Sequence, residues 1–212
     1  MKKVLLSLSL MAALLGTEAT MAQSRMDNNM VGKMSKTEFE RKNQQGAATV
    51  SAITPTSTKL SKADENLMMM VAKGGMMQLE TSKLAAEKAS SPEVREFAQA
   101  EVQEQTGLSD KLKAIAAAKG ITLPSTPDAE LQNMLSKMQS MSGAEMDKHY
   151  VQAHAIGGHE KLDKTMTMVK SQGKDDNLLS VARAAHPLVK THLKVAREME
   201  KKMMKGSMTS SR

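Results

Sequence analysis

Apolar residues recur every three to four positions through most of the chain after Ser61, with polar residues between them. This is the period of an amphipathic helix, and no segment shows the apolar–polar alternation that is typical of a strand. The pattern predicts an all-α bundle of four long helices and one extra short helix. The expected helices span 61–89, 92–119, 126–139, 142–171 and 175–205.

Residues that cap helices stand before most of these segments. The candidate caps are Ser61, Ser91, Ser142 and either Asp175 or Asp176. The connection between the first two helices is so short that they must pack antiparallel. Gly74 and Gly75 lie within the first helix, where each costs about 1 kcal/mol relative to alanine. We therefore expect a neighbouring helix to approach closely at this point.

The first residues of the chain have the order of a secretory signal. Lys2 and Lys3 precede an apolar run over 4–15, and a small residue, Ala22, ends the segment. We expect residues 1–22 to be a signal peptide, which places the protein in the periplasm or at the outer membrane. No later segment approaches the roughly 20 apolar residues of a membrane span, so no transmembrane helix is expected in the mature chain.

Between the signal and the bundle lies a polar stretch rich in Asn, Gln, Ser, Thr and Lys. It covers residues 23–60, has Phe39 as its one aromatic residue, and shows no sustained period. Such a segment buries too little apolar surface to offset the entropy of ordering it, which predicts a disordered leader. The bundle is expected over 61–205, and residues 206–212 are expected to form a disordered tail.

The charge of the chain is unevenly placed. The net charge is +7, but residues 61–202 carry twenty basic and nineteen acidic side chains. The nearly neutral bundle has no clustered basic face, which argues against nucleic acid as a partner. The leader carries six basic and three acidic residues, which predicts peripheral contact with an anionic cell envelope. The absence of cysteine excludes disulfides, thiolate catalysis and thiolate metal sites.

A few ionisable residues fall on the inward faces of the helices. On the second helix Glu101 lies within the apolar stripe and Glu104 lies at its edge. His192 lies at the centre of the stripe on the last helix, and His154 and His159 flank the stripe on the third. One hypothesis is a hydrogen-bonded network that fixes helix register. The other is a metal site for a hard ion such as iron.

Methionine is the second unusual feature, with 21 residues in the chain. Thioethers favour Cu(I), and Met134, Met138 and Met141 share one face of the short helix, which suggests a copper site. The competing hypothesis is that methionine serves as adaptable core filler, because Phe97 and Tyr150 are the bundle's two aromatic residues.

Four stretches carry a family resemblance over roughly Lys62–Met199. They read GGMMQLETSKLA, KASSPEVREFAQ, LSKMQSMSGAEMDKHY and HPLVKTHLKVA. Together they resemble the bacterial domain-of-unknown-function family 4142, whose members look like exported, ferritin-like helical bundles. The resemblance implies a ferritin-like four-helix bundle, and it implies no activity.

Ferritin-like carboxylate proteins hold two metal ions with a Glu on each of two helices and Glu-x-x-His on the other two. This chain departs from that pattern, because the second helix has Glu101-x-x-Glu104 and Val189 stands three residues before His192. The sequence therefore favours a non-catalytic binding or envelope-associated structural protein with an unknown protein or envelope partner. The alternative is a periplasmic metal-binding protein.

Overall fold

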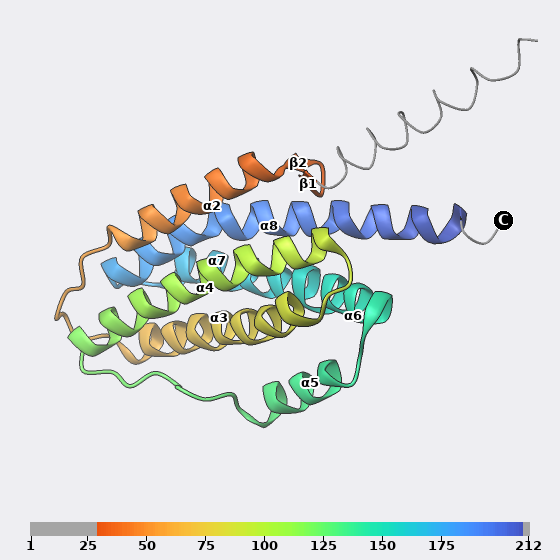
Figure 1. Cartoon of the computed structure of the whole chain (residues 1–212). Coiled ribbons are helices and arrows are strands. Elements are labelled where there is room, and N and C mark those ends of the chain that lie inside the picture. The colour runs from red at the N-terminus through yellow and green to blue at the C-terminus, as the bar shows by residue number, and fades with distance from the viewer. Residues whose placement is uncertain (1–28, 210–212) are drawn as a thin grey trace, which may run out of the picture.

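The computed structural model describes residues 29–209, and most of them are helical (Figure 1). A small antiparallel hairpin of β1 and β2 precedes the helices, with Val31 paired to Met34. The elements are β1 (Met30–Val31), β2 (Met34–Ser35), α2 (Lys36–Ser51), α3 (Lys62–Lys88), α4 (Pro92–Ala118), α5 (Ala129–Gln139), α6 (Gly143–His149), η1 (Tyr150–Ile156), α7 (Gly157–Gln172) and α8 (Asp176–Thr209). The predicted all-α bundle is confirmed.

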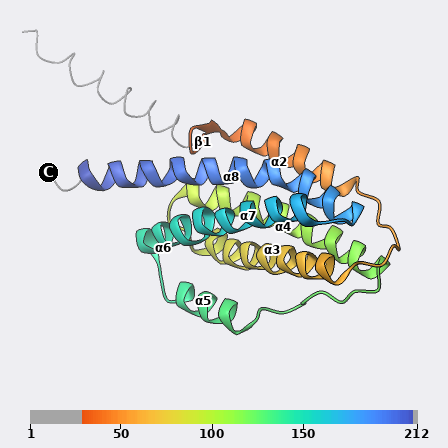
Figure 2. The ribbon, with the colours of Figure 1, turned by 180° about the vertical axis from the view of Figure 1, so that it is seen from behind.

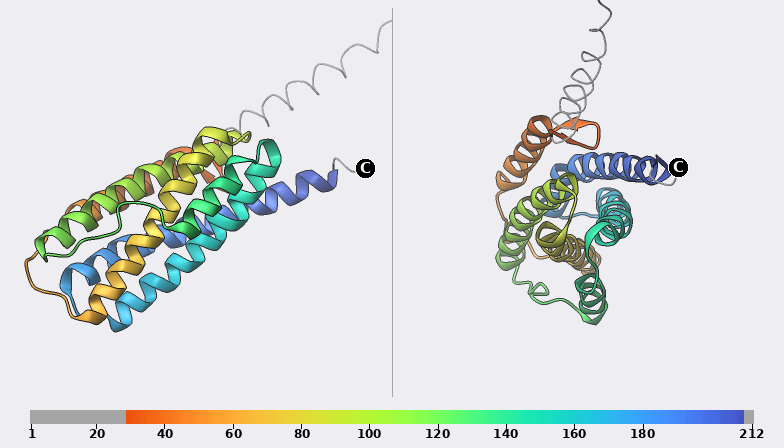
Figure 3. Two further views of the ribbon diagram at one scale, coloured as in Figure 1. Left: turned by 90° about the horizontal axis from the view of Figure 1, so that it is seen from below. Right: turned by 45° about the vertical axis from the view of Figure 1, so that its right-hand side comes forward.

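Helices α3, α4, α7 and α8 form the bundle, and their order gives it one long crossover. Helices α3 and α4 are joined by a tight turn, and α7 and α8 form the second antiparallel pair (Figures 1 and 2). The connection through α5 runs back along the outside of the bundle, so that α4 and the α6–α7 helix start at the same end (Figure 3). One crossover of this kind is the connectivity of ferritin-like bundles.

The core consists of two apolar clusters, one toward each end of the bundle. The first contains aliphatic residues and methionines from the end where α3 begins, among them Leu67, Ile115 and Val181. The second contains the aromatic residues Phe39, Phe97 and Tyr150. The candidate site lies beside this second cluster.

The predicted helix starts at the α3–α4 hairpin are confirmed. The Ser61 hydroxyl accepts a hydrogen bond from the backbone N–H of Asp64, and the Ser91 hydroxyl accepts one from Val94. A Cβ at Gly74 would lie 2.7 Å from Leu162 Cδ2 on α7, so the expected close approach of a neighbouring helix is also present. The turn between α3 and α4 and the close contact of α3 with α7 help to fix the positions of these helices along the bundle axis.

Three predicted details are corrected. Ser142 makes no side-chain capping bond, and Asp128 caps the short helix, which begins at Ala129. The predicted third helix is continuous but not uniform, because the π-helical turn η1 separates α6 from α7. A π-turn contains an extra residue relative to an α-helical turn, and it therefore changes which side chains downstream face the core.

The prediction of a disordered leader over 23–60 is wrong for the part that the structure describes. Ser35 caps α2, which packs between α4 and α8, and Phe39 and Val50 are buried beneath it. A Cβ at Gly46 would overlap the side chain of Leu188, so α2 lies very close to α8. The segment is ordered because these few apolar residues fill a groove that the four-helix bundle leaves open.

The remaining boundary predictions concern the two ends. Helix α8 continues to Thr209. The prediction of a disordered tail from residue 206 is therefore wrong for residues 206–209. The predicted signal peptide over 1–22 lies outside the described residues, as do residues 23–28 and 210–212. Within residues 29–209, no helix combines the length and the apolar character needed to cross a membrane.

Candidate metal centre

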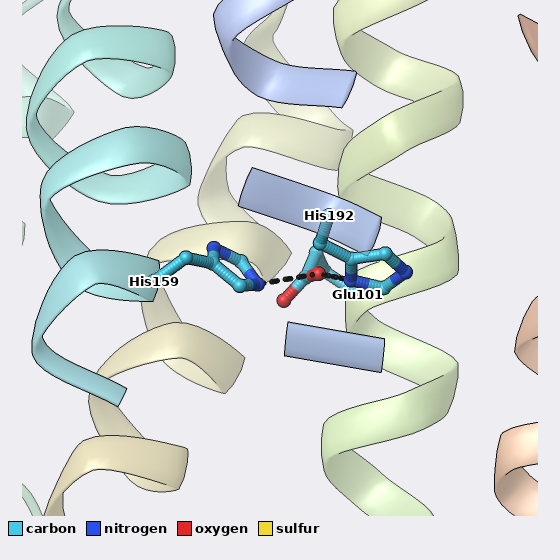
Figure 4. Close-up of side chains that lie close together, drawn as sticks. All are labelled: Glu101, His159 and His192. Atoms are coloured by element: carbon cyan, nitrogen blue, oxygen red, sulfur yellow. Dashed lines mark hydrogen bonds and ion pairs between the residues drawn. The ribbon is translucent and has the colours of Figure 1, made fainter. Parts of the chain in front are cut away.

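Three helices bring ionisable side chains together in the middle of the bundle. Glu101 comes from α4, His159 from α7 and His192 from α8, and all three are fully buried (Figure 4). His159 Nε2 lies 3.0 Å from Glu101 Oε1, and His192 Nδ1 contacts the same oxygen. One ligand atom from each residue lies within 4.8 Å of the others. The three side chains therefore converge on a single point.

A fourth side chain, Glu104, approaches this point from the next turn of α4. Its Oε2 lies 3.3 Å from His192 Nδ1, and the residue is 6 % exposed. The i, i+3 spacing places Glu101 and Glu104 on one face of the helix. Two carboxylates and two imidazoles thus form the cluster, which we call the Glu/His centre.

Outer contacts orient both imidazole rings. His192 Nε2 lies 2.6 Å from Asn43 Oδ1, and His159 Nδ1 lies 2.8 Å from the carbonyl oxygen of Ala155. Because a carbonyl oxygen accepts, these ring nitrogens are assigned as the donors. In a neutral ring the other nitrogen then carries a lone pair, and that nitrogen faces Glu101. Metal-bound histidines in proteins show this same arrangement.

Aromatic rings from α2 and α4 lie beside the imidazoles of the centre. The ring centroids of Phe39 and Phe97 lie 5.2 and 5.5 Å from that of His192, and Phe97 also lies 6.2 Å from His159. Gln78 Nε2 donates to the carbonyl oxygen of His154 at 3.3 Å. These neighbours hold the rings in place and exclude solvent from them.

Several buried polar atoms in and around the centre have no hydrogen-bond partner. They are Asn43 Nδ2, Gln78 Oε1, Glu101 Oε2 and both amide atoms of Gln105, whereas Glu104 Oε2 and His159 Nε2 have only the ion-pair contacts given above. Leaving a buried polar group unpaired costs about 1–3 kcal/mol, more if it is charged. A natural core rarely accumulates so many in one place. The set contains amide donors as well as acceptors, and the unpaired carboxylate oxygen of Glu101 is an acceptor that a cation would neutralise.

The electrostatics of the metal-free centre point the same way. Burial alone would raise the pKa of Glu101, but the charges of His159 and His192 hold it well below its usual value. Burial raises the pKa of Glu104 to about 7. Burial alone would lower the pKa of His192, but the charges of Glu101 and Glu104 raise it to about 9. The centre therefore favours a positive charge between its carboxylates, which a proton or a metal ion supplies.

Of the two predicted flanking histidines, the centre includes His159 and not His154. His154 is buried, but its ring lies beside those of His149 and Tyr150, at 5.3 and 6.3 Å between centroids. Burial, with the charge of His149 second, lowers the pKa of His154 to about 4. His154 lies within the π-helical turn η1 and His159 follows it in α7, and a π-turn changes which side chains face the core.

The methionine hypothesis stays a prediction. Met138 is fully buried in the cluster that contains Phe97, Met141 packs at the edge of that cluster, and Met134 is half-buried on α5. A place in an apolar core is what the filler hypothesis requires of Met138.

Sequence reasoning missed Asn43 and placed Glu104 only at the edge of its stripe. Asn43 lies on α2, within the segment expected to be disordered. The signal that was available is Ser35-Lys-Thr-Glu38, a capping-box pattern in which Ser35 accepts from the backbone N–H of Glu38, followed directly by Phe39. A helix start at Ser35 places Asn43 one turn beyond Phe39.

The geometry defines a class: an all-α bundle of ferritin-like connectivity with one Glu/His centre buried between its helices. A model of the domain of unknown function DUF4142 matches residues 49–199, which is well over half of the chain. The chain therefore belongs to the DUF4142 family. The searches of curated proteins and of solved structures return no match.

Proposed function

We propose that this protein binds one divalent transition-metal ion at the Glu/His centre. The observation that carries the proposal is the set of buried acceptors, in which Glu101, His159 and His192 direct ligand atoms at one another within 4.8 Å. Glu101 Oε2 lacks a hydrogen-bond partner, and Glu104 Oε2 and His159 Nε2 have only the ion-pair contacts with His192 and Glu101. A cation bound between these atoms would be coordinated by them and would offset the repulsion between the carboxylates of Glu101 and Glu104.

The donor set selects the kind of metal. Two imidazole nitrogens and two carboxylate oxygens suit Zn²⁺, Fe²⁺, Co²⁺ or Ni²⁺, whereas Cu(I) prefers sulfur ligands. One cluster of two glutamates and two histidines provides enough ligands for a single ion. The two Glu-x-x-His motifs of two-iron bundles are not present in the sequence.

The proposed role is binding without turnover. Glu101, His159 and His192 have no exposed surface, so a bound ion would have little room for a substrate at an open coordination position. The charged and apolar order of residues 1–22 supports export, with the periplasm or outer membrane as the proposed location. A bundle of this kind would store or carry a metal ion, or use it to hold the envelope-facing fold together.

The test is metal analysis of protein that has been purified without chelators or an affinity metal, followed by titration with Co²⁺ and Zn²⁺. We expect one ion per chain, and Glu101→Gln should weaken binding at least 100-fold. Co²⁺ also reports ligand geometry through its absorption spectrum. The matched control is Glu130→Gln on α5, which changes an exposed glutamate and should bind as the parent protein does.

The opposite result is also informative. If the parent protein is folded, as a cooperative thermal unfolding transition would show, and binds neither ion, the proposal is wrong. The Glu/His centre is then a proton-linked network that fixes helix register. Equal binding by the parent protein and Glu101→Gln would place the metal elsewhere on the chain.

A further inference from the structure

A cavity between α2 and α4 is lined by Asn43 and Glu104, two residues that contact His192 of the Glu/His centre. We infer that a hydrated divalent cation reaches the centre through this cavity and that Glu104 passes it inward to His192. This inference rests on the proposed metal-binding function and adds the path by which the ion arrives and leaves.

The cavity has a volume of about 460 Å³ and is open to solvent on one side. Most of the residues around it are polar, which suits a cation that still carries water. The residues that matter here are Lys36, Glu40 and Asn43 on α2, and Glu96, Ala100 and Glu104 on α4. Two of these six, Asn43 and Glu104, are also in contact with His192.

Glu104 occupies the boundary between cavity and centre. It lines the cavity, yet the residue is 6 % exposed, and its Oε2 has no hydrogen-bond partner. The same oxygen lies 3.3 Å from His192 Nδ1. Glu101, His159 and His192 do not line the cavity. Of the four side chains of the centre, Glu104 is therefore the one that an ion in the cavity meets first.

The charges at the cavity favour a cation. Glu40, Glu96 and Glu104 contribute carboxylates, and Lys36 contributes the one ammonium group among its lining residues. Lys36 Nζ lies 2.7 Å from Glu96 Oε2 and 4.0 Å from Glu40 Oε1, so it bridges α2 and α4 beside the opening. An excess of one sign of charge in a cleft raises the local concentration of the opposite ion and speeds its association.

A second cavity on the other side of α4 provides a comparison. It has a volume of about 270 Å³ and lies between α3, α4 and residues 123–127. It reaches Gln105, but none of Glu101, Glu104, His159 and His192 lines it. This cavity therefore offers no carboxylate that would pass an ion to the histidines, and it supplies a matched control.

The experiment measures the rates of Co²⁺ binding and release in the full chain by stopped-flow absorption. Ala100→Leu fills the proposed path with a larger side chain, and Ala72→Leu makes the same change at a half-buried alanine in the second cavity. We expect Ala100→Leu to slow both association and release into excess chelator at least tenfold, with the dissociation constant nearly unchanged. Ala72→Leu should match the parent protein.

A charge variant tests the same path with little risk to folding. Glu40→Gln lies on the exposed face of α2, and it should slow association about twofold to fivefold and weaken its dependence on salt, whereas Glu130→Gln should do neither. Unchanged rates in both Ala100→Leu and Glu40→Gln, with Co²⁺ still bound one to one, would overturn the path and leave the metal site standing. No Co²⁺ binding by the parent protein would overturn both.

Discussion

Two clusters of buried charged residues lie in the same bundle, and their polar atoms are paired to different degrees. Near the end where α3 begins, Lys119 and Asp175 form an ion pair at 2.7 Å, with side-chain exposures of 0 % and 5 %. In the middle of the bundle, Glu101 and Glu104 lie beside His159 and His192. Both clusters remove charges from water, which costs several kcal/mol per ion unless partners replace the solvent.

The Lys119–Asp175 pair has its partners. The Lys119 ammonium also donates to the Thr56 hydroxyl at 3.2 Å and to the Thr58 carbonyl at 3.1 Å. Asp175 uses its other oxygen to accept from the backbone N–H of Leu178, which caps α8. Three donors on lysine and two oxygens on aspartate are thus all used. This fully paired cluster connects α4, α8 and the segment that follows α2.

The Glu/His centre is paired less completely. Glu101 Oε2 has no hydrogen-bond partner, and Glu104 Oε2 and His159 Nε2 have only the ion-pair contacts with His192 and Glu101. The Lys119–Asp175 pair uses every donor and acceptor, whereas the Glu/His centre leaves Glu101 Oε2 unpaired. This difference supports the proposal that the centre binds a cation.

The largest expected effect comes from removing one partner of the Lys119–Asp175 ion pair. Lys119→Met leaves Asp175 buried without its cation, and we expect it to lower the free energy of unfolding by about 3–5 kcal/mol. Urea denaturation measures the loss. Metal binding should persist in the fraction that folds, because Lys119 does not contact the Glu/His centre.

A double variant controls for the loss of the lysine stem. Lys119→Met combined with Asp175→Asn removes both charges, and asparagine keeps a good N-cap for α8. It should therefore be more stable than Lys119→Met alone. If Lys119→Met costs less than about 1 kcal/mol, a value typical of surface pairs, the contrast between the clusters would fail.

The second effect concerns the metal-free centre and depends on pH. The folded-state pKa of His192 is raised to about 9, above its ordinary value of 6.5. Its contribution to stability is therefore fully present below pH 6.5 and is lost as pH rises through 9. At about 1.4 kcal/mol per pKa unit, the loss is on the order of 3 kcal/mol.

The measurement is the difference in unfolding free energy between the parent protein and His192→Gln, made with chelator at pH 6 and pH 9.5. The difference should shrink as the pH rises, and NMR titration of the His192 ring should give the pKa directly. A ring that loses its proton near pH 6.5 would show that the carboxylates do not hold a positive charge in the metal-free protein.

The smallest of the three effects tests the outer contact that orients His192. Asn43→Leu removes the acceptor 2.6 Å from His192 Nε2, and we expect it to weaken metal binding 10- to 100-fold. Isothermal titration with Zn²⁺ measures the change. Gln44→Leu makes a similar substitution at the next, exposed position of α2 and should leave affinity unchanged. Equal affinity in all three proteins would limit Asn43 to a packing role.

Much of the fold could be predicted from local patterns in the sequence. Ser61, Ser91 and Asp175 cap the helices that they were expected to cap, because a capping residue acts within its own turn. The inward positions of Glu101 and His192 were also predicted, since a straight helix keeps a constant phase. His154 and His159 could not be separated in this way, because His154 lies within the π-helical turn η1 and His159 lies in the α-helix that follows it.

The N-terminal region shows the limit of composition as a guide. Residues 23–60 are polar enough to predict disorder, yet Phe39 and Val50 are buried and Asn43 contacts His192. The groove that they fill is formed by α4 and α8, which are distant in sequence. A short segment with few apolar residues becomes ordered when another part of the chain supplies a complementary surface, and no local pattern reports that surface.

By itself the sequence determined the number of long helices, most of their ends, the face that each buries and the absence of thiolate chemistry. The tertiary structure decided which inward residues lie at the same height, that Glu104 and His159 join Glu101 and His192, and that α2 covers them. The physical reason is that helical phase and capping are local properties, whereas the height of one helix against another depends on the packing of the entire core.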